Sequence, residues 1–329
     1  MSRNSRSLAL DERFHTLVEL LRPSQEDMDE YSNKLRKLDG VLKNVAPNSF
    51  AVAIGSVHRR TLTRHSDIDL LWFVPPSVIY DGIRLISSNV VLRSLHGSLG
   101  RLLPDLKISI DAPAIVIEDY NGRFEINVVP GGVKDLRHFG VELPGGLIAD
   151  RKGGWEISAP RVADAFLGKA NEESNGKIAF VARFFKFWRQ TRVKELQMSS
   201  FYVEMVLSMS GAGRFESLSE SVWRGFAALY NEVSAGRGIS LGWVDDLRPC
   251  RSKSELRRLE SALRNSWGYA TKAYVAEEEG NERKAVEYWN RVFGGFYPDY
   301  RTSRDNLGWG VKHLKKYPGT QTSIPDIFL

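Results

Sequence analysis

The stretch that decides the fold runs from Phe50 to Val74. It consists of Phe50-Ala51-Val52-Ala53-Ile54-Gly55-Ser56, ten residues, and then Asp67-Ile68-Asp69-Leu70-Leu71-Trp72-Phe73-Val74. The first apolar run ends at a glycine and the second is stopped by Pro75-Pro76, so each predicts a short buried strand. The basic segment 57–64 between them has the length of about two helical turns, and we expect a short helix there.

Gly-Ser followed by two aspartates is typical of a phosphate and metal site. Gly55 lets the backbone approach a ligand closely, and Ser56 with the expected helix start offers N–H groups and a positive dipole end to a triphosphate. Asp67 and Asp69 are two residues apart on one strand, so both carboxylates leave the same face. Hard oxygen ligands of this kind suit Mg²⁺ that bridges nucleotide phosphates. The plain alternative is a Gly-Ser turn and an exposed Asp-Ile-Asp without such a site.

These motifs resemble the nucleotidyltransferases of the DNA polymerase β superfamily. Motifs further along the chain narrow the resemblance to the bacterial cGAS/DncV-like nucleotidyltransferases (CD-NTases), and the likeness extends over about 50–298. It implies an α+β fold: a polymerase β-like lobe with a mixed twisted sheet, an α-helical lobe, and an active site in the cleft between them. It also implies an enzyme that makes cyclic di- or trinucleotides as anti-phage second messengers.

Two later motifs carry the rest of the resemblance. Lys186-Phe187-Trp188 matches the family's Lys-x-Trp, in which the lysine reaches the triphosphate. Ser200 and Phe201 resemble the family's Ser-aromatic motif. By that likeness Ser200 would hydrogen-bond a phosphate and Phe201 would stack on a nucleobase, which contributes ~1–3 kcal/mol per base. Without the family, Lys186 is a solvated lysine beside a core tryptophan, and the serine is a helix cap with Phe201 in the core.

The third acidic position departs from the family pattern. CD-NTases carry Asp-Val-Val-Pro there, and this chain has Asn127-Val128-Val129-Pro130. By that likeness Asn127 stands at a catalytic position, but an amide cannot accept a proton at neutral pH and is a weaker Mg²⁺ ligand. The sequence therefore predicts nucleotide binding with reduced or absent chemistry.

Glu125 is the alternative third carboxylate. It faces the same side as Asn127 but lies ~6.6 Å away along the strand, whereas the metals of a two-metal site are only ~3.5–4 Å apart. A β-bulge would be needed to bring its carboxylate to that position, so we assign the position to Asn127.

Three functions fit these motifs. The first is a cyclic-oligonucleotide synthase that uses ATP, GTP, UTP or CTP with Mg²⁺ or Mn²⁺ in a two-metal site. The second is a catalytically silent nucleotide-binding protein of the same fold, for which Asn127 is the main support. The third is a template-independent RNA nucleotidyltransferase, which the Lys186 and Ser200-Phe201 motifs disfavour. In the first, a separate effector protein reads the product rather than binding the enzyme.

Composition sets the remaining bounds. The 329 residues are 42% hydrophobic and 26% charged, which is ordinary for a globular protein. No apolar run approaches the ~20 residues of a membrane span and no secretory signal is present, so we expect no membrane partner and a cytoplasmic protein. A net charge of +6 fits polyanionic ligands. Cys250 is the only cysteine, which argues against zinc-dependent DNA sensing of the animal cGAS type.

Apolar periodicity and turn residues predict the other elements. Helices are expected over 8–21, 24–43, 82–103, 177–194, 218–233 and 252–279. Strands are expected over 107–110, 114–119 and 124–129, with a hairpin turn at Asn121-Gly122 and a connecting loop over 145–160. The expected organisation is a catalytic lobe with N-terminal helices at 1–159, a helical lobe at 160–299 and a tail at 300–329.

Overall fold

The computed structural model describes residues 3–64, 66–119, 124–134, 145–192, 198–241, 244–250 and 252–298, and side chains from Leu10 onward except at 244 and 245. The chain divides into two compact units. A helical unit contains, among the described residues, the chain up to Pro23, the segment Thr61–Arg64 and the chain from Leu167 to Pro298. A sheet unit contains Ser24–Arg60 and the stretch between Arg64 and Leu167.

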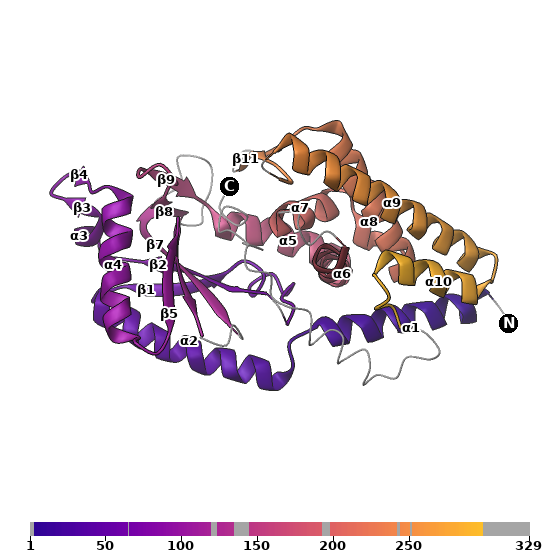
Figure 1. The fold of residues 1–329 in the computed structure, drawn as a ribbon, viewed down its shortest axis with the longest axis horizontal. Helices are drawn as coiled ribbons and strands as arrows, with labels where there is room; N and C mark the ends of the chain where they lie inside the picture. Colours follow the sequence, from indigo (N-terminus) through magenta and orange to yellow (C-terminus); the bar gives the residue numbers. More distant parts are fainter. Residues whose placement is uncertain are drawn as a thin grey trace. The chain divides into compact units, whose positions relative to one another are not determined.

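The sheet unit is built on a seven-stranded mixed sheet (Figure 1). Its strands are β1 (Phe50–Ile54), β2 (Ile68–Phe73), β5 (Lys107–Asp111), β6 (Ala114–Glu118), β7 (Glu125–Lys134), β8 (Gly145–Ala149) and β9 (Trp155–Ser158). Five of them lie in the order β1-β2-β7-β6-β5, and β8 pairs with β7 and β9. β2 and β7 run parallel and the other pairs run antiparallel. The two strands with the predicted acidic positions are therefore neighbours.

Two helices cover one face of this sheet (Figure 1): α2 (Gln25–Val45) and α4 (Ser88–Leu102). Alternate strand residues such as Leu70 and Trp72 pack against Leu42 and Leu92 of these helices. Because successive side chains point to opposite faces, residues in the other phase, such as Leu71, form a separate cluster. Burying each large apolar side chain stabilises the sheet unit by roughly 1.5–3 kcal/mol.

The helical unit is held by an aromatic core. Its helices are α1 (Arg3–Leu21), the end of α5 (Pro160–Glu173), α6 (Lys177–Arg192), α7 (Ser200–Met209), the 3₁₀ turn η2 (Ala212–Arg214), α8 (Leu218–Ala235), α9 (Lys253–Glu278) and α10 (Glu282–Val292). A hairpin, β10 (Ile239–Leu241) and β11 (Val244–Leu247), interrupts them. The Phe14 ring of α1 lies 5.0–6.2 Å from the rings of Phe184, Trp289, Phe293 and Tyr297.

The predicted α+β class is confirmed, and most expected elements are present. The helix expected over 8–21 is present as part of α1, and it buries an apolar stripe of Leu10, Phe14, Leu17 and Leu21. Ser24 caps α2 through a capping box with Asp27. The predicted turn at Asn121-Gly122 and the predicted tail at 300–329 lie outside the described residues.

Besides the helix expected over 57–64, which is only a turn, three predictions of secondary structure were wrong. The helix expected from residue 82 begins at Ser88, because Gly82 with φ +60° forms the turn of a hairpin between β3 (Tyr80–Asp81) and β4 (Arg84–Leu85), which follows the short helix α3 (Pro76–Ile79). The loop expected over 145–160 is the β8–β9 hairpin. Gly131 lets β7 approach β8 closely, since a Cβ there would lie 2.9 Å from the Leu147 carbonyl oxygen.

The third wrong prediction is that the strand expected over 124–129 ends before Pro130. β7 instead continues to Lys134. Pro130 lies where β7 changes partner, after the last pair with β6 at Val128 and before the first pair with β8 at Gly131. Proline is tolerated there because no ladder hydrogen bond to β6 or β8 requires its missing N–H.

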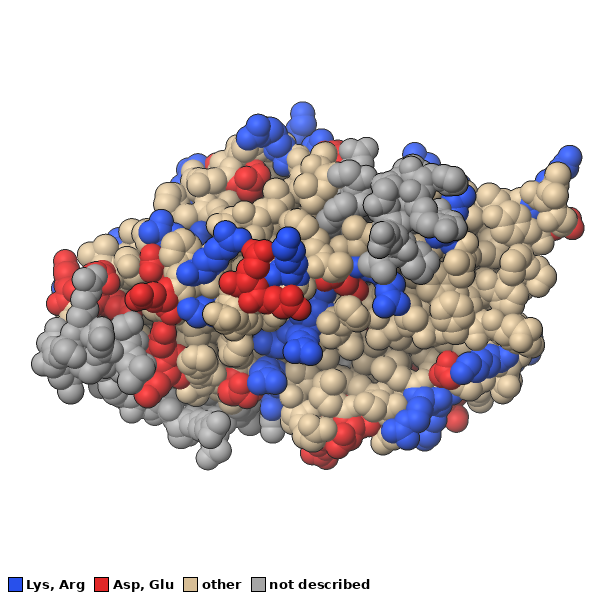
Figure 2. All heavy atoms as spheres, turned by 180° about the vertical axis from the view of Figure 1, so that it is seen from behind, with Lys and Arg blue, Asp and Glu red and all other residues tan. Residues whose placement is uncertain are grey.

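Charges on the surface are often paired along helices. Arg264 with Glu260 and Arg291 with Glu287 are i, i+4 ion pairs at 2.8 Å. The face shown in Figure 2 likewise has Lys and Arg side chains beside Asp and Glu side chains in several places. Within the described ranges, no helix combines the length and the apolar character that crossing a lipid bilayer requires.

Candidate active site

The predicted acidic residues lie at one edge of the sheet unit. β1 ends at Ile54, which is paired with Asp69 of β2, so the Gly55-Ser56 turn begins where the two carboxylates emerge. Asp67 and Asp69 are 6% and 3% exposed, and Ser56 is 8% exposed. Two largely buried carboxylates on one strand face are costly without compensating charge. This arrangement is therefore suited to holding a cation.

Asn127 is the neighbour of Asp69 across the parallel ladder. The two residues are paired in register, and the Asn127 Nδ2 donates a hydrogen bond to the Asp69 Oδ1 at 3.0 Å. With the amide nitrogen on Asp69, the amide oxygen is the only acceptor that the Asn127 side chain can offer elsewhere. The amide therefore supports one carboxylate but contributes no third negative charge.

Glu125 does not take the position of Asn127. The β2–β7 ladder runs without a shift from the pair Ile68–Ile126 to the pair Phe73–Gly131. The β6–β7 ladder is also regular and pairs Glu125 with Glu118. The described strands therefore contain no bulge that would move the Glu125 carboxylate next to Asp69, and Asn127 keeps that place.

The turn after β1 is not the helix that was expected. Gly55 has φ +69°, a left-handed conformation that glycine adopts at no steric cost. The Arg59 N–H donates to the Gly55 carbonyl oxygen at 3.0 Å, but Arg60 with φ +58° ends this single turn. N–H groups for a phosphate would therefore come from a turn, and the expected helix dipole is not available.

A buried ion pair within the sheet unit fixes this turn. The Arg59 Nη1 donates to Asp164 of α5 at 2.8 Å, and both side chains are at most 4% exposed. The His58 Nδ1 lies 3.3 Å from the other Asp164 oxygen. No sequence motif marks Asp164 as a site residue. The only sequence feature that could have indicated it is an acidic residue among the apolar positions of the amphipathic helix α5.

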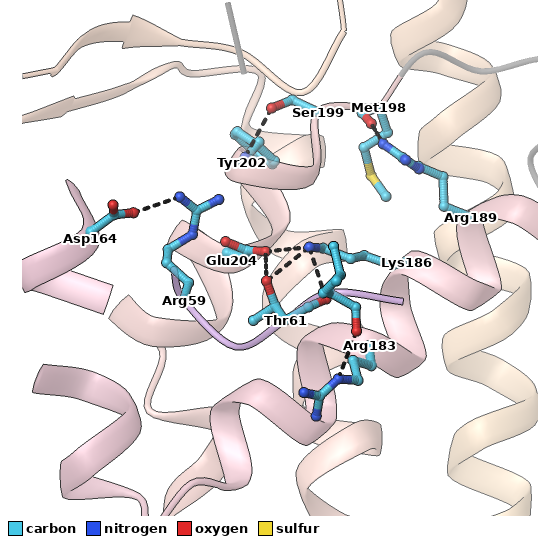
Figure 3. Close-up of polar contacts among 11 residues, drawn as sticks. Arg59, Thr61, Asp164, Arg183, Lys186, Arg189, Met198, Ser199, Tyr202 and Glu204 are labelled. Atoms are coloured by element: carbon cyan, nitrogen blue, oxygen red, sulfur yellow. Dashed lines mark hydrogen bonds and ion pairs between the residues drawn. The ribbon is translucent and has the colours of Figure 1, made fainter. Parts of the chain in front are cut away.

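The three site residues predicted in the helical unit lie on α6 and α7. Lys186 is 5% exposed and is not a solvated lysine. Its Nζ lies 2.7 Å from the Glu204 Oε1 and donates to the Thr61 Oγ1 at 2.9 Å and to the Thr61 carbonyl oxygen at 3.2 Å (Figure 3). An ammonium group has three N–H donors, so a phosphate at Lys186 would compete with these acceptors.

Ser200 and Phe201 open α7. Ser199 rather than Ser200 is the N-cap, since its Oγ accepts from the Tyr202 N–H at 3.0 Å. Ser200 is the first helical residue and is 8% exposed, so its hydroxyl lies where a helix offers N–H groups to anions. Phe201 is 0% exposed, and stacking on a base would require its ring to be uncovered.

Further buried cations line α6. The Arg183 Nε donates to the Leu62 carbonyl oxygen at 3.2 Å, and burial lowers the Arg183 pKa to about 10. The Arg189 Nη1 donates to the Met198 carbonyl oxygen at 2.5 Å, just before α7 (Figure 3). Both arginines were missed because their partners are main-chain carbonyls, which no sequence motif marks.

The residues present fit a divalent cation only in part. Among the described residues, no group of three or more His, Cys, Asp or Glu side chains is placed to hold a metal. Asp67 and Asp69 supply two hard oxygen ligands, and Mg²⁺ usually completes its shell with water and substrate phosphates. The strand edge therefore fits a Mg²⁺ that arrives with a nucleotide.

This chain has the nucleotidyltransferase fold of the cGAS/DncV-like proteins, which confirms the resemblance at the level of the fold. CdnC from E. coli MS115-1, solved with ATP, matches with a TM-score of 0.64 and 15% identity over 87% of this chain and 98% of that chain. The Vibrio cholerae cyclic AMP-GMP synthase DncV, solved with nonhydrolyzable GTP, matches with a TM-score of 0.61 and 15% identity over 93% and 83% of the two chains.

A comparison of sequences gives a weaker likeness. A probable cyclic nucleotide synthase from Bacillus cereus (strain VD146) is 22% identical over 197 residues, which are 58% of this chain and 56% of that relative. The match thus spans a little over half of the relative's length. No protein-family model matches the chain.

Proposed function

We propose that this chain is a nucleotidyltransferase that joins nucleoside triphosphates into a cyclic di- or trinucleotide and releases pyrophosphate. The observation that carries the proposal is the acidic strand edge, where buried Asp67 directly precedes β2 and buried Asp69 lies in β2 opposite Ile54, the residue before the Gly55-Ser56 turn. Two similar folds were solved with ATP and with a GTP analogue, which supports ATP or GTP as substrates.

Each predicted site residue has a role in this proposal. Asp67 and Asp69 hold Mg²⁺ or Mn²⁺, which supplies neutralisation of the charge on the phosphates. Main-chain N–H groups at Gly55 and Ser56 approach the triphosphate. In the helical unit, Lys186 and Ser200 would contact phosphates, and Phe201 would contact a base once its buried ring is uncovered.

The reaction makes and breaks one bond in each step. A ribose hydroxyl oxygen attacks the α-phosphorus, a phosphodiester bond forms, and the bond to pyrophosphate breaks. The hydroxyl proton must leave, and the Asn127 amide cannot accept it at neutral pH. The proton therefore passes to water, and the protein contributes mainly positioning and charge stabilisation. Turnover is consequently slow.

A silent nucleotide-binding protein of the same fold is the second candidate. The hydrogen bond from Asn127 to Asp69 favours it, because the amide stabilises the strand edge without a proton acceptor. Such a protein would bind triphosphate with Mg²⁺ and release no pyrophosphate.

Incubation with Mg²⁺ or Mn²⁺ and labelled triphosphates tests the proposal. A ribonuclease-resistant cyclic product, identified by mass, is the expected result. The double variant Asp67→Asn/Asp69→Asn serves as the negative control. Tight triphosphate binding without any product would instead establish the silent protein, and transfer to an RNA end would establish an RNA nucleotidyltransferase.

The proposal includes the role that the resemblance implies. The product would act as an anti-phage second messenger in the cytoplasm, where nucleoside triphosphates are available, and a separate effector protein would read it. Phage plating on cells that express the chain with its effector tests this role. Protection that is equal for the wild type and for Asp67→Asn/Asp69→Asn would contradict it.

A further inference from the structure

The carboxylate of Glu204 is the hub of a closed polar ring inside the helical unit. Its Oε1 lies 2.7 Å from the Lys186 Nζ and accepts a hydrogen bond from the Thr61 Oγ1 at 2.6 Å (Figure 3). The Lys186 Nζ in turn donates to that hydroxyl at 2.9 Å. The Thr61 hydroxyl uses its one donor on Glu204 and accepts from Lys186, so all three contacts can form at once.

This ring lies in the interior. Glu204 is 2% exposed, Thr61 4% and Lys186 5%. Stability alone does not explain a buried ion pair, because apolar side chains of similar volume often replace one at no loss, whereas removing one partner leaves an uncompensated charge. What a complete ring does provide is one defined arrangement of the groups it joins.

The ring fixes a particular segment of the chain. Thr61 comes five residues after Ser56 and begins the segment Thr61–Arg64, which packs with the helical unit. Arg183 holds the next carbonyl oxygen, that of Leu62, at 3.2 Å. The Arg64 N–H donates to the Leu21 carbonyl oxygen at 3.0 Å. The segment is thus anchored at both ends, and Glu204 is the only carboxylate in the described contacts of Thr61.

We propose that Glu204 is a positioning residue for triphosphate binding. Its carboxylate holds the Lys186 ammonium in place for a phosphate and ties Thr61 to α7, which fixes the segment Thr61–Arg64. The negative charge of Glu204 would repel a phosphate, so this carboxylate acts through Lys186 and Thr61, to which it is bound. This inference rests on the proposed function, since it concerns the same triphosphate.

The test compares ATP with adenosine as probes. Glu204→Gln keeps the shape and one acceptor but removes the charge. We expect Glu204→Gln to weaken ATP binding at least about 10-fold and to change adenosine binding less than about 2-fold. Without the Glu204 charge Lys186 is no longer held in place, so its charge-assisted contact with the phosphates is lost, and adenosine has no phosphates. Glu287→Gln is the matched control, because that carboxylate forms an exposed ion pair with Arg291 in the same unit.

Thr61 provides a second pair of variants that leaves every charge in place. Thr61→Val removes the bridging hydroxyl and should reproduce the loss of ATP affinity, whereas Thr61→Ser keeps the hydroxyl and should restore it. Hydrogen exchange at the Arg64 amide should accelerate in Glu204→Gln and Thr61→Val but not in Thr61→Ser. This measurement reports on the anchored segment without any nucleotide.

Two results would overturn the inference. Equal losses for ATP and adenosine in the folded Glu204→Gln and Thr61→Val proteins would make the ring merely structural. ATP affinity that is unchanged in both would remove the link to phosphates. A wild-type chain that binds neither probe would overturn the proposed function itself, which is a separate outcome.

Discussion

At the strand edge, Asp67 and Asp69 place two carboxylates beside a neutral amide, whereas in the helical unit Lys186 and Glu204 place opposite charges around Thr61. Both groups are buried. The interior tolerates charge when an opposite charge compensates it. The helical ring carries its own compensation, while the strand edge gathers negative charge at which a cation is useful. The helical ring should therefore respond to loss of a partner, and the strand edge should respond to metal.

The largest effect is expected when the negative charge of the strand edge is removed. Asp67→Asn together with Asp69→Asn should abolish Mg²⁺-dependent ATP binding. Losing two charge-assisted ligands of about 2 kcal/mol each corresponds to roughly 10³-fold in affinity. Isothermal titration calorimetry measures the ATP affinity of the variant and of the wild type in the presence of Mg²⁺. Asp39→Asn is the control, because that carboxylate pairs with Lys43 on the surface of α2. Unchanged affinity in the double variant would contradict the metal site.

The second prediction adds charge to the strand edge. Asn127→Asp should raise turnover, measured as pyrophosphate release, because a positioned base typically contributes roughly 10²–10⁴-fold. Triphosphate affinity should change much less. Glu125→Gln should have little effect, since the regular ladder keeps Glu125 away from Asp69. The reverse pattern, with loss in Glu125→Gln and no gain in Asn127→Asp, would contradict the assignment of Asn127.

The same Asn127→Asp variant has a readout that needs no substrate. It replaces the 3.0 Å hydrogen bond to Asp69 with a second carboxylate. Without metal it should therefore lower the free energy of unfolding by about 1–3 kcal/mol. Added Mg²⁺ should restore much of this loss. Melting curves in chelator and in Mg²⁺ measure both effects, and equal curves would show that the two side chains do not interact.

The third prediction concerns the phosphate contacts of the helical unit. Lys186→Ala and Ser200→Ala should each weaken ATP binding by about 10–100-fold and adenosine binding far less, because hydrogen bonds to charged groups contribute about 1.5–3 kcal/mol. Lys43→Ala, at an exposed lysine, is the control. Unchanged ATP affinity in Lys186→Ala would show that Lys186 binds only Glu204 and Thr61 and contacts no phosphate.

The smallest effect concerns an acid without such compensation. Burial raises the pKa of Glu277 on α9 to about 7 from its ordinary value of 4.5, with the Asp11 charge adding to the rise and a Ser219 hydrogen bond opposing it. Since the folded pKa is the higher one, the stability contributed by the protonated form is full below about pH 4.5 and is lost as pH rises through about 7.

Glu277→Gln keeps a neutral side chain at every pH. It should be more stable than the wild type by about 1–3 kcal/mol near pH ~8 and equally stable near pH ~4. Urea unfolding at the two pH values measures the difference. A variant less stable than the wild type at the higher pH would show that the Glu277 charge is well compensated, as that of Glu204 is.

Local patterns predicted much of this structure. The Ser24–Asp27 capping box and the apolar stripe of α1 involve residues three or four apart, so the sequence contains the whole interaction. The strand edge was also predictable, because spacing by two fixes a common face for Asp67 and Asp69. The site residues themselves remain predictions that binding experiments must test.

The polar partners could not be predicted. Thr61 and Glu204 are 143 residues apart, and Arg59 and Asp164 are 105 apart. No local sequence pattern predicts such pairs. Their only sign in the sequence is an acidic residue among the apolar positions of a helix. The helix expected over 57–64 is missing because Arg60, with φ +58°, leaves the helical conformation after a single turn.

The aromatic core around Phe14 determines when the helical unit can be completed. The ring of Phe14 contacts Trp289, Phe293 and Tyr297, which a ribosome makes last among the described residues. The first helix must therefore wait through synthesis of the entire sheet unit before its apolar stripe is covered. Closing so long a loop is slow, and exposed apolar surface invites aggregation meanwhile. The order of synthesis thus leaves the apolar stripe of α1 in need of protection by chaperones until the last helices are made.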